Sequence, residues 1–321
     1  MIVRWGIERL PELLDELGVQ RPFLFASERH DAPLTPVGRW SELPTDRIAE
    51  AAAAAGDSGA DALAALGGGS AIDTAKAVSA ETGLPLVSIP TTYSGAEWTT
   101  FYGVRDPDRR MRGGGADAHP AGIVYDPRLT LSLPRPETVG TSLNALAHCA
   151  EALYVRERTP DSDRHALEGA ELIGEWLPRV VHAPDDLEAR TELLRGACHS
   201  GAALAGSALA LGHALAQVLG GRYGLPHGAL NALCLPPALR FNEPVAAEEI
   251  GRFGKALGTG DPAGRVEELA QLGGFERLRD LGVPESAPAE VAEAIAARPG
   301  AKANPRPVTS ADVEQLLRSI W

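Results

Sequence analysis

Residues 60–82 read ADALAALGGGSAIDTAKAVSAET, an apolar run that meets three glycines and continues with apolar residues at helical spacing. The stretch 61–66 predicts a buried strand, and 71–82 predicts a helix. Glycines at this junction leave backbone N–H groups free at the start of the helix, where the helix dipole also favours an anion. The junction therefore indicates a pyrophosphate cradle at Gly67, Gly68, Gly69 and Ser70. A merely tight strand-to-helix turn is the alternative.

Further strands are predicted on both sides of this junction, over 21–27, in LPLVSIPTT (84–92) and in AGIVYDP (121–127). Strands separated by helical stretches are typical of a parallel, doubly wound sheet. Thr91 and Thr92 follow the strand after the glycines, so their hydroxyl groups could reach the same phosphates. A plain strand end or a helix cap is the alternative for both threonines.

After about residue 134 the strand pattern stops and apolar residues recur at helical spacing. The helices predicted there cover 138–157, 162–183, 187–220, 228–240 and 245–257, with breaks at APDD, GLPHG and FNEP. We therefore predict two domains. The first, over 1–134, is an α/β domain, and the second, over 135–321, is an all-α domain.

Composition narrows the possible partners and the setting. The chain has 321 residues, of which 44% are hydrophobic, and a formal net charge of −13 at pH 7. An acidic surface disfavours nucleic acid, and no apolar run approaches the length of a membrane span. Three cysteines without metal-binding spacing fit a reducing compartment. We expect a cytoplasmic protein that binds a small-molecule substrate and neither nucleic acid nor a membrane.

Three histidines of the second half could meet one ligand. Asn144 and His148 are four residues apart in LNALAHCAEAL and share a helix face. His213 lies on a predicted apolar helix, and His227 follows a Gly-rich turn and a proline, so two helices and a loop would bring the imidazoles together. A divalent ion prefers anionic ligands beside neutral imidazoles, so the amide of Asn144 favours a polar substrate at least as much as a metal. Satisfied structural histidines are the alternative.

A series of motifs resembles the iron-containing alcohol dehydrogenase superfamily in sequence and order. They are GGGSAIDTAKA, IPTTYSGAEWT, IVYDPRLTLSLP, LNALAHCAEALY, the segment from His213 to His227, and LPPALRFN. Within the superfamily the chain is most similar to maleylacetate reductases, on the basis of Tyr93, Asn144 and the ending ANPRPVT. The resemblance implies the dehydroquinate synthase-like fold, in which residues 1–134 form a shortened dinucleotide-binding domain and residues 135–321 form the helical catalytic domain. It also implies a homodimer, and hydride transfer from NADH or NADPH to a carbonyl or an activated double bond.

The resemblance also implies roles at the cofactor. Gly67 to Ser70 match the pyrophosphate loop, and Asp73 lies just inside the helix that follows it. Thr91 and Thr92 match residues that line the phosphate and ribose. Arg110 falls near a family lysine that borders the nicotinamide ribose.

At the reacting centre, His148, His213 and His227 match the histidine ligands of the Fe- or Zn-dependent members, and Asn144 matches their aspartate. In the reductase branch that aspartate is also an asparagine, and catalysis is thought not to need iron. The histidines would then bind substrate carboxylates or an oxyanion and relay a proton.

The chain departs from the family pattern in three places. Gln217 stands where a further histidine is expected, and the residues after His227 are closer to the dehydrogenases than to the reductases. The region before Gly67 is shorter than in the family by about one helix and part of a strand, and ERHDAPLTPVGRWSELPTD (28–46) is interpreted as loop. This shortening weakens the expected support for the adenosine half of the cofactor.

We therefore predict an NAD(P)H-dependent, metal-independent reductase of a small carboxylated carbonyl or enol compound. Two alternatives stay open. One is a family member that performs cofactor-independent acid–base chemistry, such as elimination, isomerisation or cyclisation, in a biosynthetic pathway. The other is an Fe- or Zn-dependent alcohol dehydrogenase.

Overall fold

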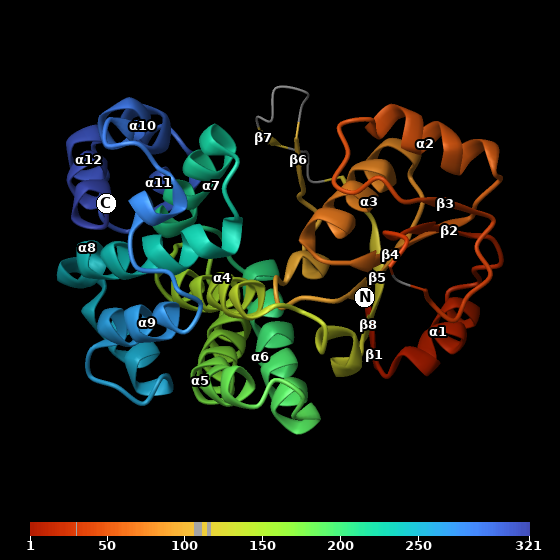
Figure 1. Cartoon of the computed structure of the whole chain (residues 1–321), viewed down its shortest axis with the longest axis horizontal. Helices are drawn as coiled ribbons and strands as arrows, with labels where there is room; N and C mark the ends of the chain where they lie inside the picture. Colours follow the sequence, from red (N-terminus) through yellow and green to blue (C-terminus); the bar gives the residue numbers. More distant parts are fainter. Residues whose placement is uncertain (30, 106–110, 114–116) are drawn as a thin grey trace. The chain divides into compact units, whose positions relative to one another are not determined.

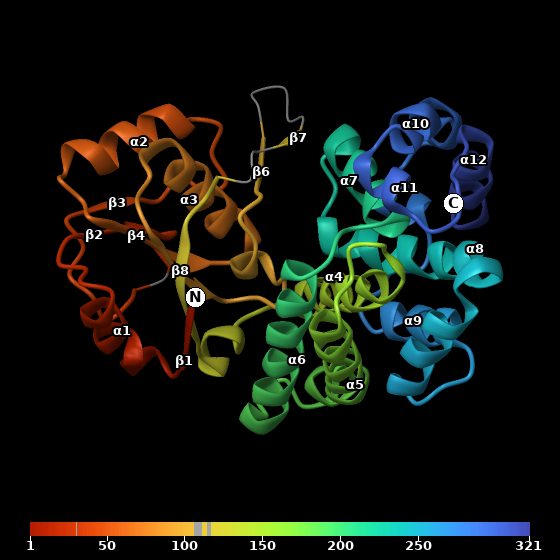
Figure 2. The ribbon, with the colours of Figure 1, turned by 180° about the vertical axis from the view of Figure 1, so that it is seen from behind.

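The computed structural model describes residues 1–29, 31–105, 111–113 and 117–321 (Figure 1, Figure 2). It consists of two compact units, the N-terminal unit Met1–Ser132 and the C-terminal unit Leu133–Trp321. The sequence analysis placed this boundary after residue 134. No helix in the described ranges is long and apolar enough to cross a membrane.

The N-terminal unit is built on a six-stranded sheet with the order β1-β8-β5-β4-β2-β3, and every neighbouring pair in it is parallel. Its strands are β1 (Ile2–Trp5), β2 (Pro22–Phe25), β3 (Gly38–Trp40), β4 (Ala62–Gly67), β5 (Leu86–Pro90) and β8 (Pro120–Tyr125). The helices are α1 (Leu10–Glu16), α2 (Ile48–Asp57) and α3 (Gly69–Thr82), and a separate antiparallel pair joins β6 (Gly103–Arg105) and β7 (Met111–Gly113). The predicted doubly wound parallel sheet is confirmed.

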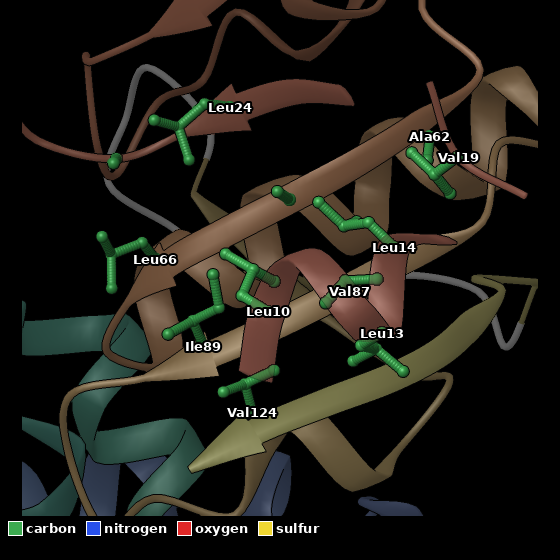
Figure 3. Packing of buried hydrophobic residues seen from close by; sticks show 12 residues of the cluster. Leu10, Leu13, Leu14, Val19, Leu24, Ala62, Leu66, Val87, Ile89 and Val124 are labelled. Atoms are coloured by element: carbon green, nitrogen blue, oxygen red, sulfur yellow. The ribbon is translucent and has the colours of Figure 1, made fainter. Parts of the chain in front are cut away.

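Alternation along the strands gives the sheet two apolar faces, because successive side chains of a strand point to opposite sides. One face packs against α1, where Leu10 and Leu13 lie over Val87 and Val124 (Figure 3). The opposite face packs against α2 and α3. Its core comprises Phe23, Phe25, Ala51, Ala55, Leu63, Ala65, Ile72, Ala75, Val78 and Leu86. The strand β4 is therefore buried on both faces. The three glycines, Gly67 to Gly69, connect its end to the start of α3.

The prediction of loop over 28–46 is wrong in part, because β3 lies inside this stretch as the edge strand next to β2. The strand is only three residues long, and its Gly-Arg-Trp sequence has no apolar alternation that could identify it. Backbone bonds hold it in place: the amide of Ala26 donates to the carbonyl of Trp40 at 3.2 Å. The N-terminal strand β1 also went unrecognised in the sequence.

The C-terminal unit is described throughout and contains helices without strands, which confirms its predicted all-α class. Its α-helices are α4 (Arg135–Tyr154), α5 (Pro160–His182), α6 (Leu187–Ala205), α7 (Leu211–Tyr223), α8 (His227–Ala256), α9 (Pro262–Gln271), α10 (Ala287–Ala296), α11 (Pro299–Ala303) and α12 (Ser310–Ser319). The central helix is α4, which is buried almost all round and packs against α5, α6 and α8. Its small and apolar residues suit that position.

Two helix boundaries differ from the sequence prediction. The single helix predicted over 187–220 is two helices, since α6 ends at Ala205 and α7 begins at Leu211. The apolar spacing continues through the break and hid it. Conversely, α8 runs through FNEP and departs from helical geometry only at Ala246. His227, which was predicted to lie in a loop, is the first residue of this helix.

Gly228 allows the close approach of α4 and α8. A Cβ atom at this position would lie 2.4 Å from the backbone carbonyl carbon of Gly140. We therefore expect Gly228→Ala to lower the free energy of unfolding by about 3 kcal/mol, the upper end of overpacking costs. Gly251→Ala on the same helix is the control, because a Cβ there meets nothing within 4 Å, and it should stabilise the protein by about 0.5–1 kcal/mol. Urea unfolding measures both, and equal effects would contradict the packing described.

Candidate active site

The structure brings three imidazoles together inside the C-terminal unit. His148 comes from α4, His213 from α7 and His227 from the first turn of α8. The rings of His148 and His213 are stacked, with centroids 4.7 Å apart and planes 11° from parallel, and the centroids of His213 and His227 are 5.8 Å apart. His148 and His213 are buried. Three segments far apart in the chain thus supply one cluster.

A buried carboxylate orients the central ring. Glu151, one turn after His148 on α4, is fully buried and accepts a hydrogen bond from His213 Nδ1 at 2.7 Å. It also accepts from the backbone N–H groups of Ala210 (2.6 Å) and His213 (3.1 Å) at the start of α7. These donors and the positive end of the helix dipole stabilise the buried anion. Because a carboxylate only accepts, the hydrogen of His213 lies on Nδ1.

The lone pair of His213 is consequently on Nε2. This atom is buried and has no hydrogen-bond partner within the described part of the chain. Buried polar atoms are normally paired, and an exception of this kind indicates a place that a ligand completes.

His148 is held by a serine of α6. The hydroxyl group of Ser200 donates to the carbonyl oxygen of Ala145 at 2.8 Å, and its oxygen lies 3.3 Å from His148 Nδ1. Since the serine hydrogen is already used, Nδ1 of His148 donates and its Nε2 keeps the lone pair. Burial, and then the neighbouring His213 and His227, hold the pKa of His148 well below its usual value. This ring is therefore a neutral acceptor near pH 7.

The side-chain amides of Asn144 and Asn231 lie beside His227. The side-chain nitrogen of Asn231 donates to Asn144 Oδ1 at 2.8 Å and lies 2.9 Å from His227 Nε2. An amide nitrogen only donates, so Nε2 of His227 accepts and its hydrogen is on Nδ1. Desolvation, and then His213, lower the pKa of His227, although this residue is exposed to solvent at the start of α8.

This donor set fits a divalent metal ion poorly. Asn144 provides a neutral oxygen, the lone pair of His227 is directed at the amide of Asn231, and both oxygens of Glu151 already accept hydrogen bonds. In the described ranges, the ligand atoms of the three histidines also do not form a group within 4.8 Å of one another. Metal sites usually combine deprotonated or anionic ligands at close spacing. The residues instead fit a polar organic ligand.

In the N-terminal unit, the glycines form a bare helix start. Gly68 is the N-cap of α3, and no described side chain caps the helix there. A Cβ atom at Gly68 would lie 2.8 Å from Thr92 Cγ2, and one at Gly67 would lie 2.7 Å from the Cβ of Ala71. The hydroxyl oxygen of Thr92 is buried and has no partner among the described residues. Backbone N–H groups and this hydroxyl thus offer donors to an anion.

The remaining predicted cofactor residues differ in their surroundings. Ser70 is exposed in the first turn of α3, and Thr91 is buried at the end of β5. The carboxylate of Asp73 is 3.0 Å from Lys76 Nζ and accepts from the amide of Gly103 at 3.1 Å, so it holds the end of β6. Arg110 lies outside the described residues.

Three site residues were missed in the sequence, namely Glu151, Ser200 and Asn231. Glu151 had a usable signal, because it is the one charged residue in the apolar stretch 144–154 and lies one turn from His148. Asn231 is four residues after His227, which places the two on one helix face only once His227 is known to be helical. Ser200 had no signal, since its role depends on the packing of α6 against α4.

Together the two units have the dehydroquinate synthase-like fold. The chain matches the iron-containing alcohol dehydrogenase family over residues 4–127 and the C-terminal region of the Fe-containing alcohol dehydrogenase family over 138–321. It is 38% identical to the maleylacetate reductase of Burkholderia cepacia over 280 residues, covering 87% of this chain and 79% of that protein. It is 37% identical to that of Sphingobium indicum over 276 residues, covering 86% and 78%.

A solved structure of maleylacetate reductase from Agrobacterium tumefaciens has a TM-score of 0.91 at 29% identity, with 100% of this chain and 95% of that chain covered. A putative alcohol dehydrogenase from Ralstonia eutropha has a TM-score of 0.93 at 33% identity, with the same coverage. The chain belongs to the iron-containing alcohol dehydrogenase family, in which it is close to maleylacetate reductases, and it is an oxidoreductase.

The depressed pKa of His148 predicts how stability depends on pH. In the unfolded chain this histidine titrates near its ordinary value of about 6.5, so as the pH falls below that value the unfolded state binds a proton that the folded state refuses. The free energy of unfolding should therefore fall with decreasing pH, with a contribution of up to about 1.4 kcal/mol per pH unit from this residue.

Urea unfolding of His148→Asn between neutral pH and pH about 5 should show a shallower pH dependence than the wild type. His182→Asn is the control, because His182 is exposed at the end of α5. An unchanged slope in His148→Asn would show that the ring is protonated in the folded state.

Proposed function

We propose that the protein is a reductase that transfers hydride from NADH or NADPH to a small carboxylated carbonyl or enol compound of the maleylacetate type, without a metal ion. The observation that carries this proposal is the Asn144–Asn231–His227 chain. It places neutral amides where a metal would need an anion, and it accompanies sequence similarity to maleylacetate reductases.

The nicotinamide cofactor fits the glycine-lined start of α3, where Gly67, Gly68 and Gly69 would admit its pyrophosphate and Thr92 would donate a hydroxyl hydrogen. When bound, it supplies the hydride. The shortened region before Gly67 is expected to contact the adenosine half of the cofactor, where NADH and NADPH differ. Both cofactors are therefore part of the test.

The three histidines divide the proton chemistry between them. The carboxylate of Glu151 lies behind His213 and offsets the charge that this ring gains when its Nε2 takes up a proton, as in other buried carboxylate–imidazole pairs, while burial keeps His148 neutral. His213 can therefore hold a proton at Nε2 opposite an enolate or alkoxide oxygen as charge develops there. The neutral rings of His148 and His227 accept or relay hydrogen bonds. Hydride from the cofactor and a proton through His213 together balance the reduction.

A guanidinium group beside α7 supports a carboxylated substrate. Arg298 NH2 donates to Gln217 Oε1 at 2.6 Å, and Gln217 is one helical turn after His213. The Nε atom of Arg298 is buried without a hydrogen-bond partner, and no ion pair joins this side chain to a carboxylate in the described ranges. The glutamine that replaces the expected histidine thus holds a cation beside α7, one helical turn along from His213. Arginine is well suited to bind a substrate carboxylate.

The direct test is the oxidation of NADH and NADPH by the purified full chain with maleylacetate, after treatment with a chelator. We expect turnover that chelation does not reduce and that falls by a factor of about 10²–10⁴ in His213→Gln. Activity that requires added Fe or Zn would favour the alcohol dehydrogenase alternative. Failure to bind either cofactor would remove hydride transfer and leave the cofactor-independent alternative.

Substrate class is tested in the same assay with Arg298→Met, which should raise KM for a dicarboxylate about tenfold or more and leave KM for an uncharged aldehyde unchanged. Arg318→Met is the matched control, because Arg318 is exposed on α12. Equal effects of Arg298→Met on both substrates would show that the arginine is structural.

A further inference from the structure

A second cluster of metal-ligating side chains lies on the paired helices α5 and α6, which run side by side (Figure 1, Figure 2). His165 and Glu168 are three residues apart on α5, and His199 faces them from α6. His165 Nδ1 is 2.9 Å from His199 Nδ1, which is 3.0 Å from Glu168 Oε2. In the described part of the chain, this is the one group of at least three such residues with ligand atoms all within 4.8 Å.

The available hydrogens do not satisfy these contacts. Arg164 NH2 lies 2.9 Å from His165 Nε2, and because a guanidinium only donates, Nε2 accepts and the hydrogen of His165 is on Nδ1. This Nδ1 donates to His199 Nδ1, which then offers its lone pair. The same nitrogen faces an oxygen of Glu168, so two lone pairs oppose each other. Moving the His165 hydrogen to Nε2 instead places two donors face to face at Arg164.

Protonation of His199 does not remove the conflict. A hydrogen on its Nδ1 would satisfy Glu168 but oppose the hydrogen on His165 Nδ1. Burial also lowers the pKa of His199, with Glu168 acting in the opposite direction. The three atoms converge as three lone-pair donors would around a cation.

We propose that His165, Glu168 and His199 bind one divalent transition metal ion, with Zn²⁺ as the best match, and that the ion acts as a clip between α5 and α6. Two imidazoles and one carboxylate are an ordinary zinc donor set, with water as the fourth ligand. In tetrahedral zinc the ligand atoms are about 3.3 Å apart. Two of the three separations here are 2.9 and 3.0 Å, and the third, between His165 and Glu168, is within 4.8 Å.

The surroundings fit a metal-bound His165. With the ion on Nδ1, the ring hydrogen is on Nε2, which is 3.8 Å from Asp161 Oδ2, so this carboxylate needs to move closer to accept the hydrogen bond. A carboxylate behind a zinc-bound histidine is the common arrangement, because it fixes the tautomer. A hydrogen on Nε2 of His165 would displace Arg164, which then keeps its hydrogen bond to Asp161 Oδ1 at 2.8 Å. The site shares no residue with the His148, His213 and His227 cluster, which comes from other helices.

The experiment uses the full chain without a histidine tag, stripped with a chelator and dialysed against Zn²⁺. Bound zinc per chain and the unfolding temperature are measured for the wild type, His199→Gln, Glu168→Gln and the control His182→Gln. We expect the wild type and the control to bind one equivalent more than His199→Gln and Glu168→Gln. We also expect zinc to raise their unfolding temperature by a few degrees, as for any ligand of the folded state.

Co²⁺ in place of zinc provides a second readout. The wild type and His213→Gln should both show the visible absorption of tetrahedral Co²⁺, and His199→Gln should lose it. His213→Gln distinguishes this site from metal at the other imidazoles. Equal zinc content in the wild type, His199→Gln and Glu168→Gln, or loss of the Co²⁺ spectrum in His213→Gln alone, would overturn the proposal.

Discussion

The hydrogen bond between the buried carboxylate of Glu151 and Nδ1 of His213 fixes the tautomer of the central imidazole in the C-terminal unit. A buried charge is expensive unless donors compensate it, and here the start of α7 supplies two backbone N–H groups besides the imidazole. The same contacts tie α4 to α7. The position of His213 and the packing of the two helices are therefore set by Glu151. The lone pair on Nε2 of His213 has no hydrogen-bond partner among the residues that the structure describes.

The three imidazoles differ because each ring contacts a different side chain. His213 has an anion, His148 a serine hydroxyl group, and His227 the amide of Asn231. Only the carboxylate carries a charge that offsets a proton added to its ring, so the three imidazoles differ in their electrostatic surroundings. Asn144 and Asn231 form a neutral pair beside these rings. An aspartate at position 144 would add the anionic ligand that a metal ion prefers.

Much of the fold could be predicted from the sequence, because β2, β4 and β5 are fully buried apolar runs and three consecutive glycines mark the junction after β4. The short edge strand β3 could not be, since three residues carry no periodicity and its partner β2 provides the hydrogen bonds. At the site, spacing on one helix identified Asn144 and His148. Ser200 and Asn231 needed the packing of three helices, which no local pattern contains. The glycine at 228 and the helical position of His227 likewise emerge only where α8 meets α4.

The central claim is that Glu151 holds the hydrogen of His213 on Nδ1 and leaves Nε2 as an acceptor. Nuclear magnetic resonance of the isotope-labelled histidine side chains reports the tautomer of each ring directly. At neutral pH the account predicts an Nδ1–H tautomer for His213 in the wild type, and a loss of that preference in Glu151→Gln. An Nε2–H tautomer for His213 in the wild type, or a spectrum that Glu151→Gln leaves unchanged, would contradict it.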